Sequence, residues 1–206
     1  MKKTLLLLVS LTIIGFYITG CSQKTKYDRK LKHELASGVR ADSLFMGFYF
    51  GMPDKDFYTR CWELNKKGLI KQGGNNTTVE YEIRNELRYP CVMNFYPSFV
   101  KGKIAEMPVR FVYSGWAPWN KELTSDKLQI DILNWYKKSF GDEFIEVEHP
   151  EKGKAFVNIS GNRRISIFKE DELHVWAVFT DMLVRKEKAD SSKFGKNPID
   201  NLKELK

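Results

Sequence analysis

Two segments of the chain have the apolar period of an amphipathic helix, and each is followed by runs with the period of a strand. The first helix is predicted between Pro53, which suits a first helical position, and Gly68, which suits a stop. The second is predicted between Ser125 and Gly141. The apolar stripes are Phe57, Cys61 and Leu64 in the first helix, and Leu128, Ile132, Trp135 and Tyr136 in the second. The order helix, strands, helix, strands is the strongest constraint on the fold.

The strand-like runs are rich in Tyr, Val, Phe and Ile. They are residues 79–83, 90–96 and 109–113 after the first helix, and residues 144–147, 155–159, 165–168 and 175–179 after the second. Residues 43–52 form another strand-like segment, and Gly161-Asn162 marks a hairpin turn. We expect an α+β domain with two helices packed on an antiparallel sheet, and the order also admits two tandem helix-plus-strands halves.

The N-terminus has the features of a secretory signal. A positive start, Lys2-Lys3, precedes a stretch without charge at residues 4–23. The apolar run ends in Ile18-Thr19-Gly20-Cys21, which resembles the lipobox of bacterial lipoproteins. The resemblance implies that Cys21 is acylated with lipid, palmitate included, and becomes the first residue of the mature protein. The alternative is an uncleaved transmembrane anchor, since about 20 apolar residues can span a bilayer.

We divide the chain into a lipoprotein signal peptide at residues 1–20, a basic tether at 21–40, a single α+β domain at 41–184 and a polar C-terminal tail at 185–206. Loss of the signal peptide lowers the formal charge from +8 to +6. This basic charge suits anionic lipid headgroups or acidic envelope polymers, and we expect no nucleic-acid partner. The basic start of the tether favours a periplasm-facing protein, because surface-exported lipoproteins of the Bacteroidota carry acidic residues there.

The remaining cysteines and the histidines give little chemistry. Cys61 and Cys91 are both predicted to point into the core, where they form either a disulfide or two buried free thiols. No histidine lies near either cysteine in the sequence, so a catalytic thiol is not expected. His33, His149 and His174 have no zinc-binding spacing, and no phosphate-binding glycine loop occurs. We therefore expect no metal and no cofactor.

Two motifs that would indicate an enzyme are weak. Glu146 and Glu148 share a face of a predicted strand that is too exposed for a general-acid pair. Ser98 and Lys101 match S-x-x-K, but that motif requires a helix, and the segment is predicted to run from a strand into a turn. An enzyme is left open, with a non-catalytic protein favoured.

The loop SGWAPWN, residues 114–120, is the main surface candidate. Trp116 and Trp119 either stack on a sugar or anchor a protein partner, or they plug the core between the halves. Asn120 would add a polar contact, together with Arg163 and Arg164, if all three face one cleft.

Two resemblances complete the sequence analysis. Asp42-Ser43-Leu44 is similar to the short O-glycosylation signal of the Bacteroidota, which makes Ser43 a candidate acceptor. The stretches DSLFMGFYFGMPDKDFYTRCWELNKKG and GWAPWN resemble uncharacterised small lipoproteins of the Bacteroidota, over about residues 40–183. That family has no assigned activity.

We expect a lipid-anchored protein of the cell envelope that acts as a non-catalytic binding module. Its partners would be the membrane, through the anchor, and an unidentified envelope protein or glycan. The alternatives are a glycan-binding protein built on Trp116 and Trp119, and a hydrolase that acts on glycan or peptide.

Overall fold

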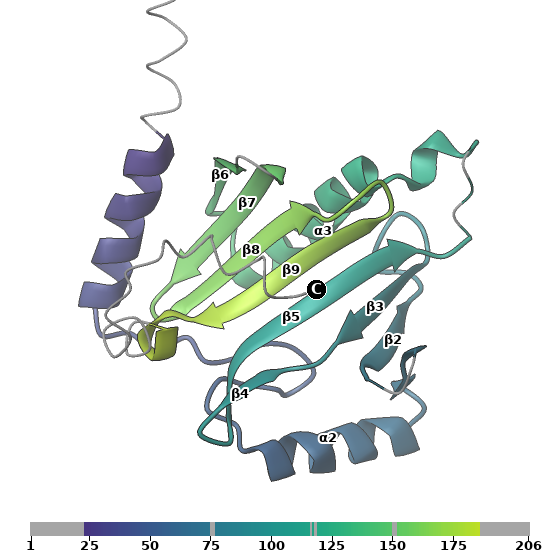
Figure 1. Cartoon of the computed structure of the whole chain (residues 1–206), viewed down its shortest axis with the longest axis horizontal. Helices are drawn as coiled ribbons and strands as arrows, with labels where there is room; N and C mark the ends of the chain where they lie inside the picture. Colours follow the sequence, from purple (N-terminus) through teal and green to yellow (C-terminus); the bar gives the residue numbers. More distant parts are fainter. Residues whose placement is uncertain (1–22, 75–76, 116, 118, 150–151, 186–206) are drawn as a thin grey trace, which may run out of the picture.

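The computed structural model describes residues 23–74, 77–115, 117, 119–149 and 152–185. Within these residues, helices pack on a nine-stranded antiparallel sheet, so the predicted α+β class is confirmed (Figure 1). The two predicted helices are α2, Asp54–Lys66, and α3, Ser125–Phe140. Further helical segments cover residues 23–36 and 182–185, and the 3-10 helix η2 covers Lys121–Leu123.

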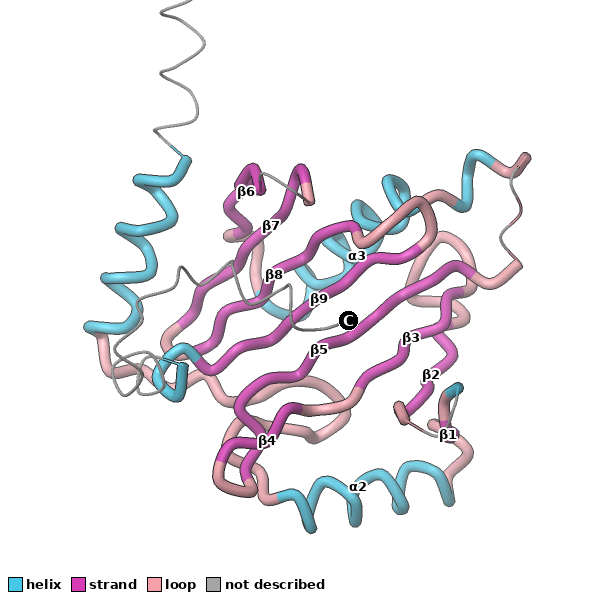
Figure 2. The backbone as a smooth tube through the Cα atoms, viewed as in Figure 1, coloured by secondary structure: helices cyan, strands magenta, loops and turns pink. Residues whose placement is uncertain are grey.

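The sheet is built from two meanders that meet in its centre. The strands are β1 Lys71–Gln72, β2 Val79–Ile83, β3 Cys91–Phe95, β4 Ser98–Val100, β5 Lys103–Tyr113, β6 Phe144–His149, β7 Gly153–Ser160, β8 Arg163–Lys169 and β9 His174–Asp181. Their order is β1-β2-β3-β5-β9-β8-β7-β6, with β4 beside the first part of β5 (Figure 2). β5, the last strand of the first half, pairs with β9, the last strand of the second half. From either edge of the sheet toward this pair, the strands follow one another in chain order, with β4 outside this path. This is the arrangement of two tandem helix-plus-strands halves.

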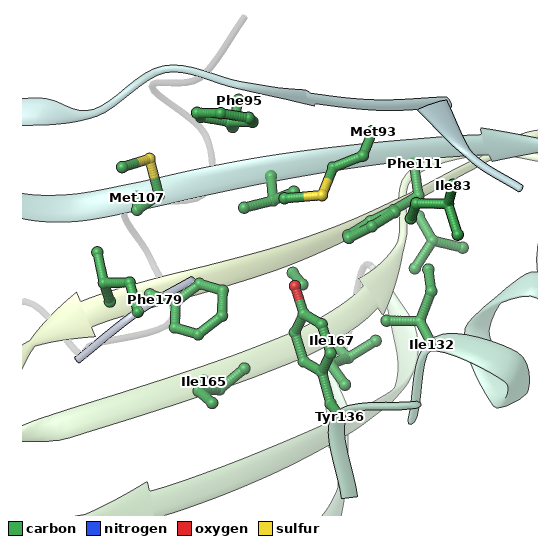
Figure 3. Close-up of a cluster of buried hydrophobic side chains, with 14 of the residues drawn as sticks. Ile83, Met93, Phe95, Met107, Phe111, Ile132, Tyr136, Ile165, Ile167 and Phe179 are labelled. Atoms are coloured by element: carbon green, nitrogen blue, oxygen red, sulfur yellow. The ribbon is translucent and has the colours of Figure 1, made fainter. Parts of the chain in front are cut away.

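The main core lies between one face of the sheet and α3 (Figure 3). Leu128, Ile132 and Tyr136 of α3 are buried against central strands, where Phe111 and Phe179 are fully buried. Each buried Leu or Ile contributes about 1.5–3 kcal/mol, so the apolar period of α3 fixes which of its faces meets the sheet.

Helix α2 follows Pro53, which occupies the N-cap position. Phe57 and Leu64 from the predicted stripe are buried, and Cys61 is half-buried. The Phe57 ring centroid lies 5.1 Å from that of Phe48, so α2 is joined to the residues that precede it by aromatic packing.

The strand predicted at residues 43–52 is wrong, because this segment turns back on itself. Met46 and Gly47 have φ of 51° and 82°, and Ser43 and Tyr49 form an isolated bridge. The Arg60 side chain stabilises the turn by donating a hydrogen bond of 2.9 Å to the Met46 carbonyl. The segment still buries Leu44, Phe48 and Phe50.

Strand β5 is longer than the run predicted at residues 109–113, and it continues through Pro108. Proline lacks the N–H of a sheet ladder and is rare in central strands. Pro108 is tolerated because it lies where β3 ends, at the pair Phe95 and Val109, and before β4 begins, at the pair Ser98 and Glu106.

Part of the predicted tether is helical and contacts the domain. In the helix at residues 23–36, Lys30 Nζ lies 2.6 Å from an Oε of Glu143, and Glu34 accepts a hydrogen bond of 2.8 Å from the Gly161 amide. The start of β6 and the β7–β8 turn therefore hold this helix.

Candidate functional site

A cavity of about 320 Å³ lies between α3, the helix-covered face of the sheet and residues 43–45. Four aromatic side chains line it, together with one charged group, Arg163. The aromatic residues are Phe45, Trp135, Tyr136 and Phe140. The volume is at the lower end of the range of about 300–1,000 Å³ for small-molecule sites.

Arg163, at the start of β8, is 8 % exposed. Its guanidinium carbon lies 4.7 Å from the ring centroid of Phe140, and its Nη1 donates a hydrogen bond of 2.7 Å to the Ser43 carbonyl. Among the described residues, its Nε–H has no partner. Burial lowers the pKa of Arg163, and no neighbouring carboxylate raises it. Buried charges are normally paired, so this guanidinium is unusual. Arg164 on the opposite face is also buried with an unpartnered Nε, but it has hydroxyl contacts with Tyr27 and Thr180, and it does not line the cavity.

The cross-strand neighbour of Arg163 is Asp181 on β9, and another arginine binds it. Arg40 Nη2 lies 3.3 Å from Asp181 Oδ2 and 2.7 Å from Asp42 Oδ1. The backbone amide of Leu183 donates a hydrogen bond of 3.0 Å to Asp181 as well. Among the described residues, the partners of the Arg163 guanidinium are therefore the Ser43 carbonyl, by a hydrogen bond, and the Phe140 ring.

Tyr136 also lines the cavity, and its hydroxyl is buried with no hydrogen-bond partner among the described residues. Tyr136 is 3 % exposed, and its hydroxyl points from α3 toward the sheet (Figure 3). Burial raises the pKa of Tyr136, so the hydroxyl stays protonated and can donate. A buried hydroxyl without a partner costs about 1–3 kcal/mol.

Residues 37–45, which we name the strap, contribute Ser43, Leu44 and Phe45 to the cavity wall. The strap is fastened to the β7–β8 turn by Asn162, which accepts a hydrogen bond of 2.7 Å from the Ala41 amide and donates one of 3.0 Å to Asp42. A Cβ atom at Gly161 would lie 2.4 Å from the Val39 carbonyl oxygen, and the φ of Gly161 is 54°. Only glycine allows the strap to approach this closely.

The structure separates the residues that the sequence grouped around the Trp loop. Trp116 lies outside the described residues, and Trp119 is 84 % exposed, so it does not plug the core. Asn120 caps η2 by accepting a hydrogen bond of 3.1 Å from the Glu122 amide.

Arg163 and Arg164 are consecutive in β8, so their side chains lie on opposite faces of the sheet. The single cleft considered for Asn120 and these two arginines is not formed. Arg164 instead contacts Tyr27 and Thr180, at 3.4 Å and 3.5 Å.

Cys61 and Cys91 are free thiols, so the disulfide considered for them is not formed in the structure. Burial raises the pKa of the Cys61 thiol to about 11 and that of Cys91 to about 12. Thiols with such pKa values carry little thiolate at neutral pH and are weak nucleophiles. Cys21, the predicted lipidation site, lies outside the described residues.

Two further candidate sites are Ser43 and the cluster of Glu170, Asp171 and His174, where the β8–β9 loop meets the start of β9. Ser43 is exposed at the rim of the cavity, which leaves its hydroxyl accessible. Glu170, Asp171 and His174 place ligand atoms within 4.8 Å of one another. Glu170 already forms an ion pair with Arg110 at 2.7 Å, and Asp171 Oδ2 lies at hydrogen-bonding distance, 2.9 Å, from His174 Nδ1. These contacts account for the closeness of the three side chains, and we assign no metal site to them.

A larger cleft of about 620 Å³ lies beside β1 and β2. Five of its eleven lining residues are charged, and several of these pair with one another. Lys71 Nζ lies 2.7 Å from Glu82, and Arg84 lies 2.9 Å from the same carboxylate. Hydrogen bonds from Lys71 and Arg84 lower the pKa of Glu82 to about 2. Because its charges are paired and exposed, this cleft is a weaker candidate than the cavity of Arg163.

The sequence contains a signal for the burial of Arg163. Residues 165–168 and 175–179 predict adjacent strands, and consecutive residues of a strand point to opposite faces. One of the two arginines before Ile165 had to face the helices. For Tyr136, the apolar stripe predicted burial, but nothing in the period showed that its hydroxyl would have no partner.

In the part of the chain that the structure describes, no helix combines the length and apolar character that crossing a membrane requires. No family model, curated protein or solved structure matches the chain.

Proposed function

We propose that this protein is a lipid-anchored binding module of the bacterial cell envelope, facing the periplasm, and that the cavity of Arg163 and Tyr136 is its ligand site. The observation that carries the binding function is the buried Arg163 guanidinium, which lies against the Phe140 ring in an aromatic-lined cavity and forms no ion pair with a described residue. The lipobox at residues 18–21 supports the anchor.

The polar groups that line the cavity are suited to hold a ligand. The Arg163 guanidinium and the Tyr136 hydroxyl are donors at neutral pH, and Ser139 adds a hydroxyl at the rim. A hydrolytic site needs a nucleophile or water next to a general base. None of the side chains that line this cavity is a carboxylate, a histidine or a cysteine, so binding is better supported here than hydrolysis.

Native mass spectrometry of the protein purified from its own membrane tests the binding function. We expect a noncovalent small-molecule adduct on the wild-type protein that is lost in Ser139→Trp, which fills the cavity from α3. Lys138→Trp is the matched control, because Lys138 is exposed and does not line the cavity. Absence of an adduct, or equal retention in both variants, would refute the ligand site.

The anchor is tested separately at Cys21. We expect the mature N-terminal peptide to begin at Cys21 and to carry the mass of acyl chains, palmitate among them. Cys21→Ser should lose the acyl mass and retain residues 1–20, because the serine lacks the thiol that the lipobox presents for acylation before cleavage. A wild-type mature chain that retains residues 1–20 would contradict the lipoprotein assignment.

Trp119 favours a second candidate function, contact with an envelope glycan or protein. A Trp side chain that is 84 % exposed leaves a large apolar ring in water, which is typical of a binding surface. Trp119→Ala should abolish retention on envelope glycan without changing stability, and Trp62→Ala, another exposed tryptophan, is the control. Equal retention of both variants would remove Trp119 from consideration.

A further inference from the structure

We propose that the ligand of this cavity is a small carboxylate with an apolar body, bound side-on by the Nε and Nη2 edge of Arg163. The inference rests on the binding function proposed above and adds the chemical class of the ligand. The inference combines two observations, the unpartnered Nε of Arg163 among the described residues and the apolar side chains that line the cavity.

The geometry of Arg163 indicates which edge a ligand would use. A guanidinium offers its N–H groups as edges that match the two oxygens of a carboxylate. Nη1 is already bound to the Ser43 carbonyl, and one face lies on the Phe140 ring. Nε, which belongs to the opposite edge, is buried and has no partner among the described residues, so a ligand reaches it when the cavity wall beside it shifts. A carboxylate on that edge would satisfy the charge and the orphan donor together.

The walls determine the rest of the ligand. Phe45, Trp135 and Phe140 present aromatic rings to the cavity, and Met93 adds a thioether. Such walls favour an apolar body, aromatic or aliphatic, over a sugar, whose hydroxyls would need many more partners. The Tyr136 hydroxyl can donate to a second oxygen of the ligand, which would remove its own desolvation cost.

The charge balance favours a monoanion. Among the described residues, Arg163 is the single cation that lines the cavity, and Arg40 of the strap pairs with Asp42 of the strap and with Asp181 of β9. A dianionic phosphate would bring more negative charge than one guanidinium compensates, whereas a neutral ligand would leave Arg163 unpaired. A carboxylate with one charge matches the site.

Calorimetric titration of the full chain in lipid nanodiscs tests the proposal, with empty nanodiscs as the blank. The probes are 2-naphthoate, its uncharged analogue 2-naphthamide, and acetate, which has the charge without the apolar body. We expect 2-naphthoate to bind at least about ten times more tightly than either of the other probes, because only it uses both parts of the cavity. Equal binding of the amide, or no binding of 2-naphthoate, would overturn the proposal.

Arg163→Gln and Arg164→Gln form a matched pair of variants. Both arginines are buried and adjacent in sequence, but they lie on opposite faces of β8. We expect Arg163→Gln to weaken 2-naphthoate binding by about 10- to 100-fold and Arg164→Gln to leave it within about twofold. If Arg163→Gln does not fold, Ser139→Trp replaces it, since it blocks the cavity without touching the guanidinium. Unchanged binding in Ser139→Trp would refute the site.

The binding function and the carboxylate class of the ligand can be refuted separately. A native adduct that is lost in Ser139→Trp but proves to be uncharged would keep the binding function and refute the carboxylate. Absence of any adduct, together with tight 2-naphthoate binding that depends on Arg163, would keep the chemistry of the cavity and refute its use in the envelope.

Discussion

Arg163 and Tyr136 leave polar atoms without partners inside the protein, and both atoms belong to side chains that line the same cavity. A buried polar group without a partner is costly in free energy, so two of them at one place need a common explanation. A ligand that accepts from both would supply it. The unliganded protein should then gain stability when one of these groups is removed.

Tyr136→Phe tests this cost directly. We expect the free energy of unfolding to rise by about 1 kcal/mol, because the variant removes an unsatisfied hydroxyl and keeps the ring that packs on Phe111 and Phe179. Tyr113→Phe is the control, since Tyr113 donates a hydrogen bond of 2.7 Å to the buried Asp131 and its loss should cost about 1–3 kcal/mol. Urea unfolding gives both values. A Tyr136→Phe variant that is less stable would show that the hydroxyl has a partner in solution.

The buried thiol of Cys91 predicts a loss of stability in base. Burial raises its pKa to about 12, whereas an unfolded thiol ionises near about pH 8.5. Between these values the unfolded state loses a proton that the folded state keeps, so the free energy of unfolding falls as the pH rises. The slope from this one group is at most about 1.4 kcal/mol per pH unit.

Cys91→Ala isolates this contribution. The variant loses packing at every pH, but its stability deficit relative to the wild type should shrink between pH 8 and pH 10, as urea unfolding would show. Cys61→Ala should give nearly the same change between pH 8 and pH 10, because both folded thiols stay protonated there, and the two variants should diverge only above about pH 11, the raised pKa of Cys61. A constant deficit for Cys91→Ala across this window would contradict the burial argument.

At the residue scale, the sequence predicted burial better than it predicted polar partners. The stripe of α3 placed Leu128, Ile132 and Tyr136 in the core, because burial follows from a local period. The free edge of Arg163 depends on Ser43 and Phe140, which are far from it in the sequence. No local pattern contains such a contact.

Among the elements, the strap shows how a glycine fixes tertiary structure. Gly161→Ala combines two costs, a φ of 54° that disfavours a side chain and a contact of 2.4 Å between the new Cβ and the Val39 carbonyl oxygen. Gly68→Ala has the first cost alone, with a φ of 67° and no atom within 4 Å of the new Cβ. We expect about 1–2 kcal/mol of destabilisation for Gly68→Ala and clearly more for Gly161→Ala.

Trypsin cleavage after Arg40 gives a second readout for the strap. If the contact with Val39 drives the strap away from the β7–β8 turn, cleavage should accelerate in Gly161→Ala and remain at the wild-type rate in Gly68→Ala. The 2-naphthoate affinity should fall in parallel, because Phe45 and Ser43 are carried by the strap. Equal cleavage rates in the two variants would show that the strap is held by other contacts.

Helices and most strands were predictable because their periods are local. β2 has the predicted bounds, and α3 differs from its prediction mainly in having Thr124 as the N-cap. The prediction failed at residues 43–52, where an apolar run resembles a strand but Met46 and Gly47 adopt positive φ. The predicted strand also began only at Val109, whereas β5 begins at Lys103. A proline such as Pro108 is rare inside a strand, and it is accommodated here by the break between β3 and β4.

On the scale of the whole molecule, the two halves share one core. β5 and β9 pair over seven residues of each strand, from Glu106 with Thr180 to Val112 with His174. The ring of Tyr136 lies 6.2 Å from Phe111 of the first half and 5.6 Å from Phe179 of the second. Separation of the halves would therefore expose an open edge strand and much of this core.

We therefore expect fragments 41–115 and 116–185 each to lack a cooperative unfolding transition when studied alone. Far-UV circular dichroism as a function of urea measures this, because a folded domain of this size gives a sigmoidal transition. An equimolar mixture is the control, and it should recover strand signal because pairing of β5 with β9 covers both exposed edges. If either fragment alone unfolds cooperatively, its half has an independent core, and the junction between β5 and β9 is a domain interface.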